Sequence, residues 1–493
     1  MKKLFLVLFV LCSLFSFHCF PQRQDRIWVF GDSVGIDFNN LSNPTVFTVP
    51  TVTVPDEGFA SVADNNGNLL YYMGPARNTN YQNYSGVYNG SFQMIQNGDS
   101  LFTNRSFTQG DLFIPENADT DKTLLFYIWD DWNGPPWSGL AYARLSRYAN
   151  SGGGSVLMRD SLIFIDELAE KITAVRHANG RDWWIIAKAD SSDKFYKILI
   201  QNDSIIYMGY QRIGPSFPPL STYIIQGQMI FDRAGDKLAY VGTGWPKVAV
   251  LDFDRCTGIF SNYRGYHTPN TSNYGCSFSP TGKYVYVSDF DRLYQVDAES
   301  PDTMNSFNLI YQDDLTDSFL IGASLLAPDD KIYIVSGFES EPNNVFDHRN
   351  MNLSVIQNPN NPGVSCNFDT LAFHLGGHRA YGGLPNMVNY NLGPLIGSPC
   401  DTLTVGVSEK KDKNDQINIF PNPATNNVTI SSNNNFNIKL ILYDLDGRET
   451  LKYSSDFSRN YSISLSNIPN GVYIMSVGLG EKNIIYKKLV VIK

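Results

Sequence analysis

The sequence predicts an all-β protein with more than one domain. The 493 residues include 28 Tyr, 31 Phe and 7 Trp, or 13% aromatic residues, whereas charged residues make up only 17%. The aromatics lie in short alternating runs between turns rich in Gly and Pro, as half-buried strands require. A chain about three times the length of a typical domain should contain at least two. This composition excludes a disordered chain and a coiled coil.

The charge balance is acidic. The chain has 38 Lys and Arg against 48 Asp and Glu, a formal net charge of −10, and no basic block beyond the extreme N-terminus. Such a surface repels a phosphate backbone. We therefore expect no nucleic-acid partner.

The N-terminus has the pattern of a secretory signal peptide. Lys2 and Lys3 precede an apolar run from Leu4 to Phe17 that is interrupted only by two serines. This run is shorter than the roughly 20 residues of a membrane anchor, and no later run approaches that length. We predict a signal peptide at residues 1–22, export to the periplasm and no integral membrane span.

The middle of the chain repeats one pattern, a polar turn followed by an alternating apolar run. The clearest copies begin at residues 231, 278 and 326 and are 47 and 48 residues apart. This period fits one four-stranded blade of a β-propeller. We expect Tyr240, Val287 and Val335 to occupy equivalent strands, and the strand after each turn to lie near the axis. Residues 23–400 then hold seven or eight blades.

Parts of this region resemble secreted β-propeller-like proteins that carry type IX secretion sorting domains. The likeness rests on residues 28–38, 57–72, 170–186, 253–258 with 275–287, and Gly383-Leu-Pro-Asn386. That family has no generally assigned enzymatic activity. The resemblance therefore implies a fold and an export route rather than a chemistry.

A second domain follows a polar linker. Residues 401–416 end in Ser408-Glu-Lys-Lys-Asp-Lys-Asn-Asp-Gln416, which has the composition of a linker. Residues 417–493 return to alternating apolar runs and tight turns, which predict a small immunoglobulin-like β-sandwich.

Four ordered motifs in residues 417–493 resemble a type A sorting domain of the type IX secretion system. The resemblance implies that the secretion translocon and its surface protease are partners, and that the protein is secreted or displayed on the cell surface. The motif residues are Pro421, Asn422, Pro423, Asp444, Gly447, Gly471, Val472, Tyr473, Lys488, Leu489 and Val490.

Four cysteines remain after signal removal, and an oxidising compartment favours disulfides. Three connectivities are possible. We favour Cys256 with Cys276 and Cys366 with Cys400, because these pairs close the shortest loops. A zinc site is disfavoured by the absence of a Cys-x-x-Cys pair.

Three patterns invite a catalytic or metal-binding interpretation. Gly31-Asp32-Ser33 matches the motif of an esterase family, but the late Asp-x-x-His that would activate the serine is missing, so a turn is favoured. His374 and His378 have metal spacing, although two intervening glycines oppose the helix that it needs. His177 precedes an Asn-Gly turn and is favoured as a packed residue.

Two acidic turns could bind calcium. Asp64-Asn-Asn-Gly-Asn68 and Asp444-Leu-Asp-Gly447 both supply oxygens on a tight loop, but both lack a distal bidentate Glu. Hairpin turns are the favoured interpretation, and we predict no cofactor.

One loop departs from the repeat. The segment from Asp130 to Trp137 combines Asp130, Asp131, Trp132 and Trp137 with two prolines. Indole faces beside carboxylates suit a carbohydrate or peptide ligand, whereas the alternative is a rigid loop that packs its Trp on its own Pro.

The leading hypothesis is a non-enzymatic exported protein whose propeller binds an unknown extracellular glycan or protein. The alternative is a propeller enzyme, a lyase or glycan hydrolase acting on extracellular polymers. Such an enzyme needs convergent His, Asp, Glu or Arg side chains, and a structure in which three or more of them meet at the axial mouth would overturn our preference.

Overall fold

The computed structural model describes residues 22–493 except 51–56, 77–83, 117–120, 131–137, 217–225, 243–246, 270–272, 290, 315–318, 339–344, 402–416, 445–447 and 480–482. The described residues up to Asp401 belong to one compact unit, and those from Ile417 belong to a second. The predicted signal peptide and linker fall almost wholly outside the described residues and stay predictions.

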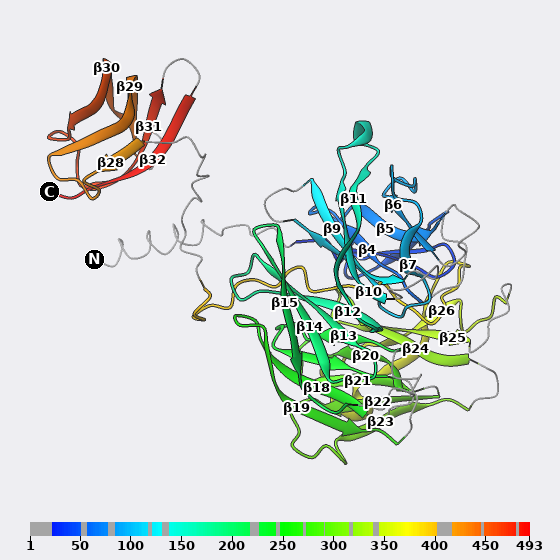
Figure 1. The fold of residues 1–493 in the computed structure, drawn as a ribbon. Helices are drawn as coiled ribbons and strands as arrows, with labels where there is room; N and C mark the ends of the chain where they lie inside the picture. Colours follow the sequence, from blue (N-terminus) through cyan, green and yellow to red (C-terminus); the bar gives the residue numbers. More distant parts are fainter. Residues whose placement is uncertain are drawn as a thin grey trace. The chain divides into compact units, whose positions relative to one another are not determined.

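The described residues of the first unit form seven antiparallel sheets, one of three strands and six of four (Figure 1). In chain order, the first four sheets contain β1 (Ile27–Phe30), β2 (Val34–Asp37), β3 (Thr45–Thr48); β4 (Ser61–Ala63), β5 (Leu69–Pro75), β6 (Tyr84–Asn89), β7 (Leu101–Asn104); β8 (Asp111–Pro115), β9 (Lys122–Asp130), β10 (Ser138–Ser146), β11 (Ser155–Ile165); and β12 (Leu168–Arg176), β13 (Trp183–Ala189), β14 (Lys194–Gln201), β15 (Ser204–Arg212).

The remaining three sheets repeat the same meander. They contain β16 (Met229–Phe231), β17 (Lys237–Tyr240), β18 (Lys247–Asp254), β19 (Ile259–His267); β20 (Asn273–Phe278), β21 (Tyr284–Asp289), β22 (Arg292–Asp297), β23 (Phe307–Gln312); and β24 (Phe319–Leu326), β25 (Ile332–Phe338), β26 (Asn352–Ile356), β27 (Phe368–His374). Two short 3-10 helices, η1 (Asn150–Gly152) and η2 (Gly363–Cys366), lie in connections. Within the described part of the chain, no helix has the length and apolarity needed to cross a bilayer.

The seven sheets form a closed ring. Apolar clusters fill the interface between every pair of neighbouring sheets, including the seventh and the first. At that last interface Tyr333 of β25 packs edge-on against Trp28 and Phe38, with ring centroids 5.8 and 5.5 Å away. The unit is therefore a seven-bladed β-propeller, and the predicted fold class is confirmed.

The predicted repeat is also confirmed in its register. Tyr240, Val287 and Val335 lie on β17, β21 and β25, the second strand of three successive sheets. All three are buried in contacts between neighbouring blades.

The strand nearest the axis is not the one we expected. The first strand of each sheet contacts the first strand of the next around most of the ring, so the strand after each repeat turn is second from the axis. Its apolar run is buried because blades pack on both of its faces, a pattern that a sequence cannot distinguish from burial at the axis.

Residues 379–401, which we call the strap, cross the centre of the ring. The strap accepts hydrogen bonds from Asp32 in the first sheet and Ala323 in the seventh, at Arg379 O (2.8 Å) and Gly382 O (2.9 Å). Asn386 N then donates to Phe59 O beside the second sheet (2.7 Å). The strap thus occupies the space between β24 and β1 and then continues across the inner strands (Figure 1).

Asn386 is the central anchor of the strap. Its side chain is 2% exposed, and its Nδ2 donates to Asp111 O of β8 (3.0 Å) and Ile172 O of β12 (2.9 Å). Four residues later, the Tyr390 hydroxyl donates to Phe113 O (2.8 Å). The strap therefore satisfies backbone acceptors of inner strands that have no further strand on their axial side.

The second unit is a small β domain around its own core. It contains β28 (Ile417–Phe420), β29 (Asn427–Tyr443), β30 (Glu449–Ser464), β31 (Gly471–Leu479) and β32 (Asn483–Val491). The first half of β29 pairs with β28 and its second half pairs with β31, while β30 follows both halves. The five strands belong to one hydrogen-bonded sheet, and one apolar cluster joins residues of both halves of β29 in a single core.

Replacing Asn386 by Ala should destabilise the propeller by about 2–4 kcal/mol, because two buried carbonyls lose their donor. Ile396→Ala, a change at an 87% exposed strap position, is the matched control and should cost less than about 0.5 kcal/mol. Urea unfolding of the two variants measures the difference. Equal stability would show that the strap does not hold the inner strands.

Candidate functional site

Three of the four sorting motifs of the second unit meet at its last strand, β32. Asn422 Nδ2 donates to Lys488 O (2.8 Å), and Asn422 Oδ1 accepts from Val490 N (2.9 Å). Pro421, Asn422 and Pro423 are exposed, as is Lys488. One asparagine side chain therefore links the Pro-Asn-Pro motif to the Lys-Leu-Val motif.

The Gly-Val-Tyr motif supports the same strand from the other side. Gly471, Val472 and Tyr473 pair with Val491, Val490 and Leu489 across β31 and β32. The Tyr473 ring is buried, and its hydroxyl donates to Pro469 O (2.8 Å).

The Asp444 turn is a hairpin connection. Asp444 N donates to Arg448 O (3.0 Å) and Asp444 Oδ1 accepts from Arg448 N (2.8 Å). Gly447 lies outside the described residues. The carboxylate is thus engaged in turn geometry.

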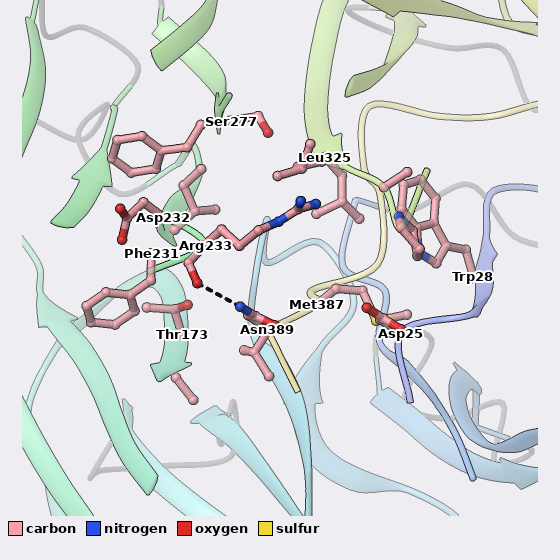
Figure 2. A pocket seen from close by; sticks show the side chains of 17 residues that line it. Asp25, Trp28, Thr173, Phe231, Asp232, Arg233, Ser277, Leu325, Met387 and Asn389 are labelled. Carbon is pink, nitrogen blue, oxygen red and sulfur yellow. Dashed lines mark hydrogen bonds between the residues drawn. The ribbon is translucent and has the colours of Figure 1, made fainter. Parts of the chain in front are cut away.

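A pocket opens at one axial mouth of the propeller (Figure 2). It is lined by inner-strand residues of several sheets, such as Thr173 and Ser277, and by strap residues such as Asn389. Its volume is about 100 Å³, whereas pockets for drug-sized ligands occupy about 300–1,000 Å³. It has room for a few water-sized groups and not for a sugar chain.

Three charged residues line this mouth: Asp25, Asp232 and Arg233. Burial raises the pKa of Asp25, and burial together with the neighbouring Asp236 raises the pKa of Asp232 to about 7. The Arg233 side chain extends across the pocket (Figure 2). Three candidate side chains therefore line the mouth, whereas our condition for an enzyme also requires that they meet in one group.

Each of these groups is also engaged in structural contacts. Asp232 Oδ1 accepts from Asp236 N (3.0 Å) and Lys237 N (3.1 Å) within the repeat turn. Arg233 pairs with Asp330 of the seventh sheet's turn at 2.6 Å. Asp25 Oδ2 accepts from Asn391 Nδ2 at 3.3 Å. These contacts engage all three side chains, but the buried Asp25 Oδ1 has no hydrogen-bond partner among the described residues and only an ion pair with Arg26 at 3.6 Å.

A second group of polar side chains lies deeper along the axis. The Tyr274 hydroxyl donates to Glu57 Oε2 (2.7 Å), and the Thr108 hydroxyl donates to Glu170 Oε2 (3.2 Å). Burial, with the charge of Glu57, raises the pKa of Glu170 to about 7. A Cβ on Gly383 would lie 1.7 Å from Glu57 O, so the strap is pressed against this group. The strap therefore lies directly against the Glu57 backbone, beside this group, in which Glu57 and Tyr274 are partly exposed.

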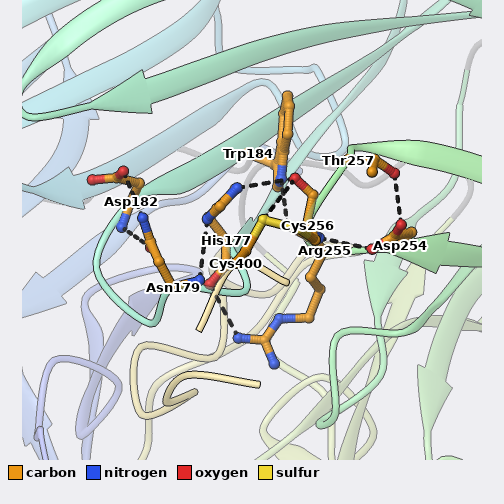
Figure 3. Close-up of a disulfide and its surroundings, with 9 residues drawn as sticks. All are labelled: His177, Asn179, Asp182, Trp184, Asp254, Arg255, Cys256, Thr257 and Cys400. Carbon is orange, nitrogen blue, oxygen red and sulfur yellow. Dashed lines mark hydrogen bonds between the residues drawn. A yellow bond between two sulfur atoms is a disulfide. The ribbon is translucent and has the colours of Figure 1, made fainter. Parts of the chain in front are cut away.

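The disulfide connects residues that we did not pair. Cys256 bonds to Cys400, with 5.6 Å between their Cα atoms (Figure 3). The other two cysteines among the described residues, Cys276 and Cys366, are both free and buried. The predicted pairs Cys256–Cys276 and Cys366–Cys400 are wrong. Cys256 lies in the outer turn between β18 and β19, but Cys276 lies on the innermost strand β20, and Cys366 packs between the sixth and seventh sheets.

His177 packs beside this disulfide. Its Nε2 lies 3.1 Å from Cys256 O, and its Nδ1 accepts from Asn179 N at 3.1 Å (Figure 3). Arg255 Nη2 donates to Gly393 O of the strap (2.6 Å), and Leu395 N donates to Ala178 O (2.8 Å). These contacts fit the packing role that the sequence favoured for His177.

The other sequence candidates lie apart from these features. Ser33 lies in the turn between β1 and β2 with a φ of 64°. His374 ends β27, where its Nδ1 accepts from Gly376 N, and His378 Nε2 lies 3.0 Å from Thr48 Oγ1. No group of three metal-binding side chains occurs among the described residues.

The two loops proposed from sequence differ in outcome. Asp64 Oδ1 accepts from Asn66 N (2.8 Å) and Asn68 N (3.0 Å), as in a tight hairpin turn. Asp130 ends β9 and its Oδ2 accepts from Asn104 Nδ2 (3.3 Å). Asp131, Trp132 and Trp137 lie outside the described residues, so ligand binding by this loop stays a prediction.

Fold and site together define an exported β-propeller with a C-terminal sorting domain. Residues 418–493 match the secretion system C-terminal sorting domain family, and this domain implies export through the type IX system. No curated protein matches the chain.

Solved structures similar to the chain include propellers of several kinds. A Bacteroides uniformis protein assigned provisionally as a 6-phosphogluconolactonase has 13% identity and a TM-score of 0.45, with 73% of this chain and 98% of that chain covered. The Dos1 propeller has 13% identity and a TM-score of 0.42, with 72% and 83% covered. The Pseudomonas aeruginosa periplasmic gluconolactonase PpgL has 10% identity and a TM-score of 0.40, with 80% and 98% covered. Likeness at this level carries no information about chemistry.

The Cys400→Ser variant should lose about 2–5 kcal/mol of stability, because the native bond closes a loop across a sequence separation of 144 residues. Urea unfolding with and without reductant checks this. Reductant should lower the stability of the native protein to that of the variant and should leave the variant unchanged. Non-reducing peptide mapping that joins Cys276 or Cys366 to another cysteine would contradict the assignment.

Proposed function

We propose that this protein is a non-enzymatic binding protein, secreted or displayed on the cell surface, whose C-terminal domain directs type IX secretion. The observation that carries the export part is the match of residues 418–493, with their motifs joined at β32 through Asn422. The propeller is then the cargo, and its ligand is an extracellular glycan or protein.

Binding rather than catalysis is supported by what fills the axis. The first half of the strap, which crosses the ring, is largely buried, with Ala380 and Leu384 at most 1% exposed. The remaining mouth pocket of about 100 Å³ is too small for a polymer chain. Ligand recognition is therefore expected on the rims and loops of the blades.

The strap and its disulfide also suit a protein that is cut after export. A surface protease is expected to cleave in the polar linker at 401–416, where exposed backbone is accessible. The Cys256–Cys400 bond lies just before that linker. After cleavage, the new C-terminal end of the strap would thus stay fixed to the turn at Cys256.

A second candidate function is an enzyme at the axial mouth, and Asp25, Asp232 and Arg233 are the observation that favours it. A raised carboxyl pKa of about 7 at Asp232 suits a general acid or base. The purified chain can be incubated with plant and algal polysaccharides while reducing ends and unsaturated products are measured. Turnover that falls at least 100-fold in both Asp25→Asn and Asp232→Asn would replace our proposal with this one.

A chain ending at residue 407 should accumulate in the periplasm, whereas the full-length chain should reach the surface. Asn422→Ala should lower surface delivery, because it removes both side-chain bonds to β32 and costs roughly 1–2 kcal/mol locally. Asn426→Ala, at an exposed position of the same unit, is the control and should be exported normally. Cell fractionation and surface labelling measure the outcome. Equal surface display of the truncated and full-length chains would refute the sorting role.

A further inference from the structure

A groove on the rim of the propeller separates the second sheet from the hairpin between β10 and β11. We call it the Tyr148 groove. One wall contains Leu69–Tyr71 and Asn89–Ser91, and the other contains Arg147, Tyr148 and Gly152–Gly154. Its volume of about 520 Å³ lies within the range of small-molecule sites, unlike the axial pocket.

Tyr148 presents a large aromatic surface to this groove. Its side chain is 64% exposed. The Arg147 guanidinium carbon lies 4.7 Å from the ring centroid, and an Arg147 Nη2 donates to the Tyr148 hydroxyl (2.7 Å). Tyr148 N donates to Asp121 Oδ1 (3.1 Å). A ring held in this way loses little conformational entropy when it binds a ligand.

Glycines keep the groove open and its walls fixed. A Cβ on Gly90 would lie 2.0 Å from Leu69 O, so only glycine allows this close approach of two strands. Asn89 Nδ2 donates to Gly153 O (2.9 Å), which joins the second sheet to the hairpin. A Cβ on Gly152 would meet nothing within 4 Å, so this glycine of the groove wall faces open space.

The wall also holds a buried hydroxyl group without a partner. Tyr71 is 1% exposed, and its hydroxyl has no hydrogen-bond partner among the described residues. The charges of Asp121 and Arg147 act on this hydroxyl, which places it near the Arg147 side of the groove. Buried hydroxyls are usually hydrogen-bonded, so this one points to a polar group supplied from the groove.

We propose that the Tyr148 groove binds a pyranose residue of an extracellular glycan. The C–H face of the sugar would lie on the exposed Tyr148 ring, and its hydroxyls would reach Arg147, the exposed Ser91 and the Tyr71 hydroxyl. One aromatic face beside several hydrogen-bonding groups fits a sugar better than an apolar helix, which would leave those groups unsatisfied. This inference rests on the proposed binding function and assigns it a site.

Calorimetric titration of the purified full-length chain tests the proposal with cellohexaose, xylohexaose, mannohexaose and chitohexaose. At least one should bind. Tyr148→Ala should weaken that binding at least tenfold, whereas Tyr148→Phe should stay within threefold because the ring remains. Tyr71→Phe should weaken it about threefold to tenfold if the hydroxyl contacts the sugar. Tyr210→Ala, at a 50% exposed tyrosine on β15, is the control and should bind normally.

Failure of all four saccharides to bind would overturn the proposal, as would equal affinities of the native protein and Tyr148→Ala. Urea unfolding of Tyr148→Ala must match the native curve, which the exposure of the side chain predicts. If it does not, Tyr148→Leu, which keeps an apolar side chain but lacks the ring, replaces it and should also weaken binding at least tenfold. The export experiment is independent, so normal surface delivery together with absent saccharide binding would reject this site and leave the sorting role intact.

Discussion

The amide of Asn386 illustrates the constraint on which the propeller depends. A ring of seven sheets leaves the inner strands with no neighbouring strand on their axial side, so some of their backbone groups need other partners. The strap supplies them, and Asn386 alone bonds to carbonyls of two different blades. The ring is therefore closed in two ways. The seventh sheet packs on the first, and the strap fills the centre.

The path of the strap determines where a disulfide can add stability. The packing of Tyr333 on Trp28 and Phe38 already closes the ring, so a bridge between the last and first sheets would add little. The end of the strap, in contrast, leaves the centre over the turns at Ala178 and Arg255, where single hydrogen bonds hold it. A covalent bond at Cys400 prevents this end from fraying, next to the segment that is expected to be cut.

The sequence predicted those features that depend on neighbouring residues. The repeat at 231, 278 and 326 fixed the register of Tyr240, Val287 and Val335, and the tail motifs identified the sorting domain before the structure joined them through Asn422. The disulfide, the strap and the Tyr148 groove depend on contacts between residues far apart in the chain. Cys256 and Cys400 meet only because the strap crosses the ring, and no local pattern in either segment records that path.

The inner parts of the propeller hold the ring together, so we expect a ligand to bind on its rim. Inner strands and repeat turns are committed to packing, as the engagement of Asp232 by Asp236 N and Lys237 N shows. The hairpin between β10 and β11 belongs neither to the inner strands nor to the repeat turns. It departs from the repeat in its glycines and in an aromatic ring turned toward solvent, which packing alone would not select. The strap fills the axis and leaves little room for a ligand there. Changes in the sequence of rim connections can therefore create a ligand site while the ring stays closed.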